Sequence, residues 1–367
     1  MRFSPCFGLG FLALATALVA ACSSASTTPS GPTDPTAPPT GTATGTPTGT
    51  TTTPTPPPPP NTPDLACLGE ATAIEIINGL PRIDASVAGQ KGSFLVDLAT
   101  TTSTIDLSLF GTKPVATDCN PAQLGQTCTF ATFEFFGTWA PAYFITSSHK
   151  GGQSGIIGTD FLSADPFTID YTKKTMARAK AGSLCDDATL KAAGLVPLDS
   201  KGFYAVKISS LEPLSKVVAG AASNITVPNL PTVSLDIAGA KGLVQLDTGF
   251  DDAVVPLSIN VNEAFFAQIP EGALVRDAGH DLSLSTCAGV AEPVEAYTLA
   301  AGKAASLATR SFGKAVVFVK RTPPAAQKCG GIGTWTAPAA QIGATFMAAF
   351  GTWLFDPVSS RVWTTGT

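Results

Sequence analysis

Residues 246–255 read LDTGFDDAVV. The residues that lead into it, 243–246, read LVQL and are mostly apolar, as in a buried strand. Asp247 therefore stands where a buried strand opens into a loop, and the next two loop residues are Thr248 and Gly249. Because a bare Asp-Thr-Gly also occurs by chance, its meaning depends on the rest of the chain.

The same plan occurs earlier in the chain, where Asp97 stands 150 positions before Asp247. Aligned at this offset without a gap, the two halves share Ala88-Gly89, Lys91-Gly92 and Leu107-Ser108 with Ala238-Gly239, Lys241-Gly242 and Leu257-Ser258. We expect strands at residues 83–87 and 233–237, turns at 88–92 and 238–242, and return strands that end on the two aspartates. A repeat of this kind predicts two halves built on one plan.

A second shared block lies downstream of each aspartate. Residues 155–162 read GIIGTDFL in the first half, and residues 341–347 read QIGATFM in the second. A strand and a polar turn are expected after each block, at residues 167–171 and 352–356.

Together these segments resemble the retropepsin and pepsin aspartic peptidases, in which Asp-Thr-Gly lies between hydrophobic strands and a hydrophobic-hydrophobic-Gly element packs around that loop. The resemblance covers most of residues 64–367. It implies an all-β, two-lobed acid-protease (pepsin-like) fold in which each lobe is a closed or partly open β-barrel. The lobes are expected at residues 64–190 and 191–367.

The resemblance also implies an aspartic-type endopeptidase that acts on a peptide or protein substrate without a cofactor or metal. Asp97 and Asp247 would be the catalytic pair, one carboxylate acting as base and the other as acid on a shared water. Like-charge repulsion would keep one proton on the pair. Thr248 and Gly249 would support the active-site loop, together with Leu98 and Ala99 of the first lobe, as implied by the resemblance.

The first loop departs from the family pattern, because Leu98 and Ala99 follow Asp97 where the family has Thr and Gly. We expect Leu98 to leave the buried hydroxyl of Thr248 unpaired, at a cost of about 1–3 kcal/mol. The alternative function is therefore a catalytically inactive relative that binds peptides or another ligand as a surface lipoprotein. Carboxylates of Asp97 and Asp247 within about 3 Å of each other would favour the enzyme.

Three other features have both a functional and an ordinary interpretation. Asp251 and Asp252 lie where retropepsins have acidic residues that contact the substrate backbone, but in isolation they fit solvated loop charges. The region from Cys119 to Cys128 is the candidate for the flap over the cleft, yet it lacks the tyrosine of the pepsin flap and also fits a surface hairpin closed by a disulfide. Aromatic side chains gather in residues 130–144, where we expect core packing rather than a substrate subsite.

Cysteine usage indicates an oxidising compartment. Beyond residue 60 the chain has six cysteines, an even number that predicts three disulfides with fifteen possible pairings. The two lobes favour Cys67–Cys185, Cys119–Cys128 and Cys287–Cys329. A zinc site is not expected, because no Cys-x-x-Cys pair is present and the histidines are only His149 and His280.

The beginning of the chain predicts export. Residues 1–21 have the charged start and short apolar centre of a signal peptide. Their boundary with Cys22 resembles a bacterial lipobox, which implies a lipidated Cys22, while an ordinary signal peptide is the alternative. Ser23 implies, by resemblance, sorting to the outer membrane, on a face that the sequence leaves open. Residues 22–63 form a Thr/Pro-rich linker that cannot bury a core.

Composition excludes other classes. A net charge of -5 with 22 Lys and Arg spread along 367 residues gives no basic stripe, so no nucleic-acid partner is expected. No second apolar run is long enough to span a bilayer, which leaves the lipid as the expected membrane contact. The chain has no Gly-x-Ser-x-Gly elbow for a serine hydrolase and no glycine-rich loop before a helix for a nucleotide. We expect a monomer.

Overall fold

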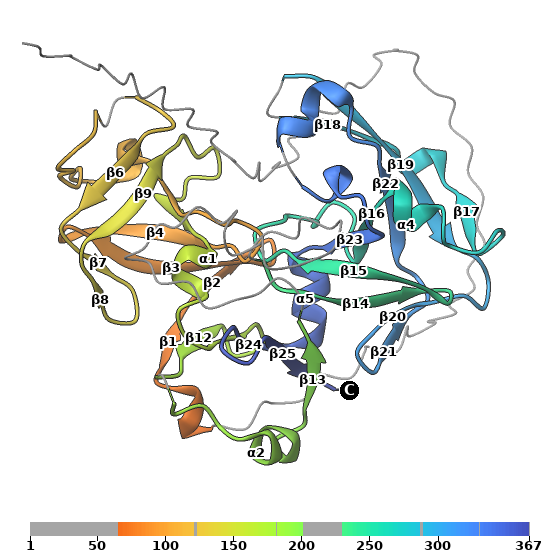
Figure 1. Ribbon diagram of the computed structural model, residues 1–367, viewed down its shortest axis with the longest axis horizontal. Helices are drawn as coiled ribbons and strands as arrows, with labels where there is room; N and C mark the ends of the chain where they lie inside the picture. Colours follow the sequence, from red (N-terminus) through yellow and green to blue (C-terminus); the bar gives the residue numbers. More distant parts are fainter. Residues whose placement is uncertain are drawn as a thin grey trace, which may run out of the picture.

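The computed structural model describes residues 65–120, 123–180, 182–200, 230–286, 289–329 and 331–366. The signal peptide, Cys22 and the linker lie outside these ranges. Figure 1 shows two β-rich lobes, the first in orange and yellow and the second in cyan and blue, with a further sheet below the junction between them. The predicted all-β, two-lobed architecture is confirmed. No helix in the described ranges has the length and apolarity needed to cross a membrane.

The first lobe is built on one sheet. Its strands hydrogen-bond in the order β6 (Thr127–Phe130), β9 (Ala142–Thr146), β5 (Thr104–Ile105), β10 (Gly155–Ile157), β4 (Gln90–Val96), β3 (Leu80–Val87), β7 (Phe133–Glu134) and β8 (Thr138–Trp139), with β2 (Glu75–Ile77) also paired to β3. A short helix, α1 (Thr159–Leu162), follows β10.

The second lobe has a corresponding sheet. Its order is β17 (Leu274–Arg276), β19 (Ala291–Leu299), β22 (Val316–Lys320), β16 (Ser258–Asn262), β23 (Ala339–Ile342), β15 (Ala240–Leu246), β14 (Thr232–Ile237), β20 (Ala305–Leu307) and β21 (Arg310–Phe312), with β18 (Leu282–Ser285) paired to β19. The described part of this lobe includes the α-helices α4 (Glu263–Phe266) and α5 (Ala344–Phe350).

The predicted internal repeat is present in the strand pairing. In both lobes the strand before the aspartate pairs in parallel with the strand of the downstream block, as β4 with β10 and β15 with β23. That block strand then pairs antiparallel with the strand after the aspartate, as β10 with β5 and β23 with β16. The order β9-β5-β10-β4-β3 thus matches β22-β16-β23-β15-β14, so residues paired within these five strands have register equivalents in the other half.

The hairpins before the aspartates have shorter turns than expected. Residues 88–92 were predicted as turn, but β4 already begins at Gln90, and β15 begins at Ala240. Both turn residues of the first hairpin have positive φ, with Ala88 at 46° and Gly89 at 78°. This backbone makes the two-residue turn whose twist suits antiparallel strands, so the strands extend further than the sequence pattern indicates.

A third sheet contains strands from both halves. It runs β1 (Ala71–Ala73), β12 (Thr175–Arg178), β11 (Phe167–Asp170), β24 (Thr352–Asp356), β25 (Arg361–Thr365) and β13 (Leu195–Asp199). The antiparallel pairing of β11 with β24 joins the halves directly. Helix α2 (Asp187–Ala192) leads into β13, and it lies below the sheet in Figure 1. The lobes are therefore tied together beneath the two aspartates.

Aromatic side chains fill the core of the first lobe. Phe133 is completely buried, and its ring centre lies 4.9 Å from that of Phe161 and 5.1 Å from that of Phe144. Phe94 of β4 packs on the same cluster. The core interpretation of the aromatic stretch is confirmed for these side chains, which hold β4 and α1 at fixed positions around the first aspartate.

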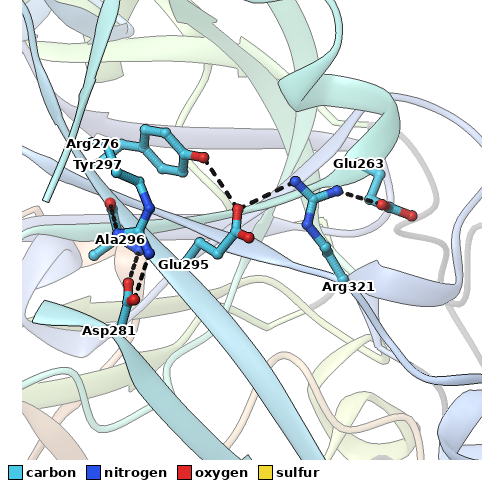
Figure 2. Close-up of polar contacts among 7 residues, drawn as sticks. All are labelled: Glu263, Arg276, Asp281, Glu295, Ala296, Tyr297 and Arg321. Atoms are coloured by element: carbon cyan, nitrogen blue, oxygen red, sulfur yellow. Dashed lines mark hydrogen bonds and ion pairs between the residues drawn. The ribbon is translucent and has the colours of Figure 1, made fainter. Parts of the chain in front are cut away.

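A network of charged side chains ties together the outer strands of the second lobe (Figure 2). Arg321 lies between two carboxylates, at 2.5 Å from Glu263 and 3.2 Å from Glu295, and the Tyr297 hydroxyl donates to Glu295 at 3.1 Å. On the adjoining strand pair, Arg276 contacts Asp281 and the carbonyl oxygen of Ala296. Exposed pairs of this kind contribute at most about 1 kcal/mol each, so this network adds little to the stability of the lobe.

Candidate active site

Asp97 follows β4 at the junction of the lobes and is completely buried. Its backbone N–H donates to the carbonyl oxygen of Ile157 at 2.9 Å, which continues the pairing of β4 with β10. The Oδ1 atom accepts the backbone N–H of Ala99 at 2.8 Å, and Oδ2 accepts the hydroxyl of Thr100 at 2.7 Å. The carboxylate is thereby fixed by its own loop.

Asp247 occupies the equivalent position after β15. Its N–H donates to the carbonyl oxygen of Ile342 at 3.0 Å, and its Oδ1 accepts the N–H of Gly249 at 2.9 Å. The Oδ2 atom accepts a hydrogen bond from Nε2 of Gln341 on β23. Burial, followed by the nearby charge of Asp97, holds the pKa of Asp247 well above its usual range.

Gly249 is the point of closest approach between the loops. A Cβ atom on Gly249 would lie 2.5 Å from both Cγ and Oδ2 of Asp97, which is inside van der Waals contact. Only glycine lets the second loop come this close to the first carboxylate. Asp97 and Asp247 lie close enough for the charge of Asp97 to act on Asp247, and Ala99 and Gly249 donate their amides to Asp97 and Asp247 respectively.

The expected loss of hydrogen bonding at Thr248 does not occur. Its hydroxyl accepts the backbone N–H of Leu98 at 3.0 Å and donates to the carbonyl oxygen of Val96 at 2.8 Å. The prediction that Leu98 leaves this hydroxyl unpaired was wrong, because both partners are backbone groups that any residue at these positions supplies. The Leu98 side chain instead joins the apolar core.

The glycine blocks pack against the active-site loops in both lobes. The N–H of Thr159 donates to the carbonyl oxygen of Thr100 at 2.8 Å, and the N–H of Ala344 donates to that of Phe250 at 3.0 Å. A Cβ on Gly158 would lie 2.6 Å from that same Thr100 oxygen. Thr100 and Phe250 are thus structural equivalents, three residues after each aspartate.

Beside each loop, a carboxylate accepts hydrogen bonds from a hydroxyl-bearing residue. The acid is the half-buried Asp160 of the downstream block in the first lobe and the buried Asp252 of the loop in the second. In the first lobe Asp160 of α1 accepts the N–H of Ser103 at 2.8 Å and its hydroxyl at 2.6 Å. In the second lobe the acid is in the loop, where Asp252 accepts the N–H of Thr345 at 2.8 Å and its hydroxyl at 2.6 Å. Burial raises the pKa of Asp160 to about 6 and also raises that of Asp252.

The two acidic residues after Gly249 have different surroundings. Asp252 is buried and both of its oxygens face Thr345, which gives it a supporting role inside its own lobe. Asp251 is half-buried, and it accepts the N–H of Ala253 at 3.0 Å and the amide of Asn78, from the first lobe, at 3.4 Å. Of the two, Asp251 retains the better access to solvent.

Tyr171 directly follows β11 and lies close enough to the second loop to interact with Asp247 and Asp252. Burial, followed by the charges of Asp252 and Asp247, raises the pKa of its hydroxyl. That hydroxyl is buried and has no hydrogen-bond partner among the described residues. It therefore adds a neutral group to the floor of the site.

Two of the three predicted disulfides are present. Cys67 joins Cys185 with a Cα–Cα distance of 5.1 Å, and Cys119 joins Cys128 at 5.2 Å. The second of these closes a hairpin in which Ala116 bridges to Phe130 of β6, at the far edge of the first sheet in Figure 1. The third predicted pair involves Cys287, which lies outside the described residues. Its partner, Cys329, ends a 3-10 helix.

Sequence reasoning missed Gln341, Thr100 and Asp160 as members of the site. Asp160 and Thr345 occupy the same position when the two downstream blocks are aligned. An acid in one block aligned with a hydroxyl in the other could therefore have pointed to this position. Gln341 had no signal in the sequence, since strand pairing alone brings it to Asp247. Within the described residues, no three His, Cys, Asp or Glu side chains converge as a metal-binding group would.

Comparison with known proteins gives structural neighbours only. No protein-family model matches the chain, and no curated protein matches it. Among solved structures, the chain is similar to the aspartic proteinase from Irpex lacteus, with a TM-score of 0.39 and 10% identity over 81% of this chain and 97% of that one. It is also similar to edgp, with a TM-score of 0.40 and 10% identity over 83% and 96% of the two chains. The assignment of the site rests on the geometry of this chain.

Proposed function

We propose that the chain is an aspartic-type endopeptidase that hydrolyses peptide bonds with a water held between Asp97 and Asp247. The observation that supports this most directly is the close approach at Gly249, which places two buried carboxylates from duplicated strands at one junction. A raised pKa at Asp247, due to burial and to Asp97, is the condition under which the pair keeps one proton.

The chemistry needs one ionised and one protonated carboxyl group. The ionised group takes a proton from the water, whose oxygen attacks the carbonyl carbon, while the protonated group donates its proton to the carbonyl oxygen. The C–N bond of the tetrahedral intermediate then breaks as a proton passes to the leaving nitrogen. The pair is regenerated in its original charge state, and no cofactor is needed for this sequence.

Cleavage of unfolded protein between about pH 2 and 7 by the full-length chain tests the proposal. We expect activity on the acid side of neutrality, and we expect Asp97→Asn and Asp247→Asn each to lower kcat by at least about 10³-fold, because either change removes one of the two proton-transfer groups. Cleavage that persists in both variants would refute the proposal.

One observation favours the alternative, a ligand-binding protein without catalysis. Leu98 has no side-chain hydroxyl, so it cannot return to the second loop the kind of hydrogen bond that Thr248 makes to the first. Saturable binding of unfolded peptide without cleavage, unchanged by Asp247→Asn, would support this function.

The place of action remains the one that the sequence predicts. We propose a lipid-anchored monomer of the bacterial cell envelope, attached through Cys22 to the outer membrane and held away from it by residues 22–63. Incorporation of labelled palmitate that is lost in Cys22→Ala would support lipidation, and unchanged labelling would contradict it.

A further inference from the structure

The outer oxygens of the two aspartates are held in different ways. In the first lobe, Oδ2 of Asp97 accepts the hydroxyl of Thr100, three residues further along the same loop. The equivalent position in the second loop is Phe250, which has no hydroxyl to donate. There Oδ2 of Asp247 is held by Gln341, which comes from the neighbouring strand β23.

Gln341 is itself fixed by a second amide. Nδ2 of Asn260 donates to Oε1 of Gln341 at 3.2 Å, and the two residues are direct partners in the antiparallel pairing of β16 with β23. An amide has a donor end and an acceptor end, so a Gln341 that accepts from Asn260 with its oxygen presents its NH₂ group to Asp247. Asn260 is only 3% exposed, which keeps water from competing for this bond.

The chain of hydrogen bonds from Asn260 through Gln341 to Asp247, here called the relay, has no counterpart at the equivalent positions of the first lobe. The register equivalents of Gln341 and Asn260 are Ile156 and Thr104, which are partners in the pairing of β10 with β5. Ile156 has no hydrogen-bonding group, and the hydroxyl of Thr104 faces Nε2 of His149 at 3.1 Å. The relay therefore makes the two carboxylates chemically different.

We propose that Gln341, oriented by Asn260, is a positioning residue that fixes the outer oxygen of Asp247 in place of the hydroxyl missing at Phe250. A hydrogen bond donated to a carboxylate favours its ionised form, which opposes the effects of burial and of Asp97. The catalytic part of this inference rests on the proposed function, but the effect on the ionisation of Asp247 does not.

Other groups also act on Asp247 and are unchanged by a substitution at Gln341. Asp97 faces it from the first loop, and Lys320 of β22 lowers its pKa. Tyr171 interacts with it from the end of β11, and Tyr171 also interacts with Asp252 of the second loop. Because these groups stay in place, the difference between variant and native chain isolates the amide.

The experiment compares Gln341→Met, which keeps the side-chain length but removes the donor, with Gln268→Met, an exposed glutamine of the same lobe. In the full-length chain we expect Gln341→Met to lower kcat about 10-fold and to move the pH profile of kcat/KM upward by about one pH unit, since removing the donor raises the pKa values of the pair. Asn260→Leu, which frees the amide without removing it, should give a smaller shift of the same sign. Gln268→Met should give none.

A second measurement does not depend on catalysis. A higher pKa in the folded state means that stability is lost as pH rises, so the Tm of Gln341→Met should fall further below that of the native chain at pH 7 than at pH 3. If the Tm difference between Gln341→Met and the native chain grows from pH 3 to pH 7 but the native chain cleaves nothing, the inference is supported and the proposed function is refuted. A constant difference in Tm, with an unshifted pH profile in an active chain, overturns the inference.

Discussion

Thr248→Val gives the sharpest test of how the lobes are joined at the site. Valine has nearly the volume of threonine, so the change removes the hydroxyl without opening a cavity. It leaves two buried backbone groups without a partner, the N–H of Leu98 and the carbonyl oxygen of Val96, which now bond the hydroxyl at 3.0 and 2.8 Å. Each of the two unpaired groups costs about 1–3 kcal/mol, so we expect the free energy of unfolding to fall by roughly 2–6 kcal/mol.

Equilibrium urea unfolding followed by tryptophan fluorescence measures this loss. Trp353 and Trp363 are buried in the sheet that joins the halves, so their emission reports on the region beneath the site. Thr72→Val, at an exposed position of β1, is the matched control and should change stability by less than about 0.5 kcal/mol. If Thr248→Val cost no more than this control, the hydroxyl would not hold the lobes, and the reasoning would be refuted.

Three further predictions concern the surroundings of the pair. Gly249→Ala should abolish activity and destabilise the chain by about 1–3 kcal/mol, since its Cβ would lie 2.5 Å from the carboxylate of Asp97. Gly111→Ala, which has open space around it, should change neither activity nor stability. Peptidase assays and Tm measurements test the two effects. Burial raises the pKa of Asp160 to about 6, so it contributes stability that is present below about pH 4 and lost by about pH 6. At about 1.36 kcal/mol per pKa unit this is roughly 3 kcal/mol, and urea unfolding of Asp160→Asn should show a flatter pH dependence over that range. A disulfide stabilises by restricting the unfolded chain, and more so for a longer loop. Cys185→Ser, which opens a loop with a sequence separation of 118, should lower the free energy of unfolding by about 5 kcal/mol, and Cys128→Ser, with a separation of 9, by about 2.5 kcal/mol. Equal losses in chemical unfolding would contradict this dependence on loop length.

The expected features that the structure bears out follow from local pattern and repetition. Strand periodicity before Asp97 and Asp247, together with the constant offset between them, predicts two equivalent strand ends. In the structure each aspartate donates its backbone N–H to the same position of its downstream block, Ile157 or Ile342. The same division into lobes gave the pairing of Cys67 with Cys185. Both inferences use the order of residues along the chain, so a sequence suffices for them.

The role of Thr248 was predicted wrongly because its partners are backbone atoms. The identity of a residue indicates which hydrogen-bonding groups its side chain has, and the leucine side chain at position 98 has none. The N–H of Leu98 and the carbonyl oxygen of Val96 are nevertheless well placed, because the end of β4 fixes their direction. Side-chain identity alone could not reveal this contact.

Hydrophobic periodicity and the repeat at an offset of 150 residues were enough to predict a duplicated β architecture, because both can be read along the chain. The resemblance to aspartic peptidases then pointed to Asp97 and Asp247. How each acid is held could be seen only in the folded chain. Gln341 reaches Asp247 from 94 residues away through the pairing of β23 with β15, and Gly249 approaches Asp97 across the seam between lobes. Contacts of this kind depend on strand register and interlobe packing, which are set by the whole core rather than by any local stretch of the chain.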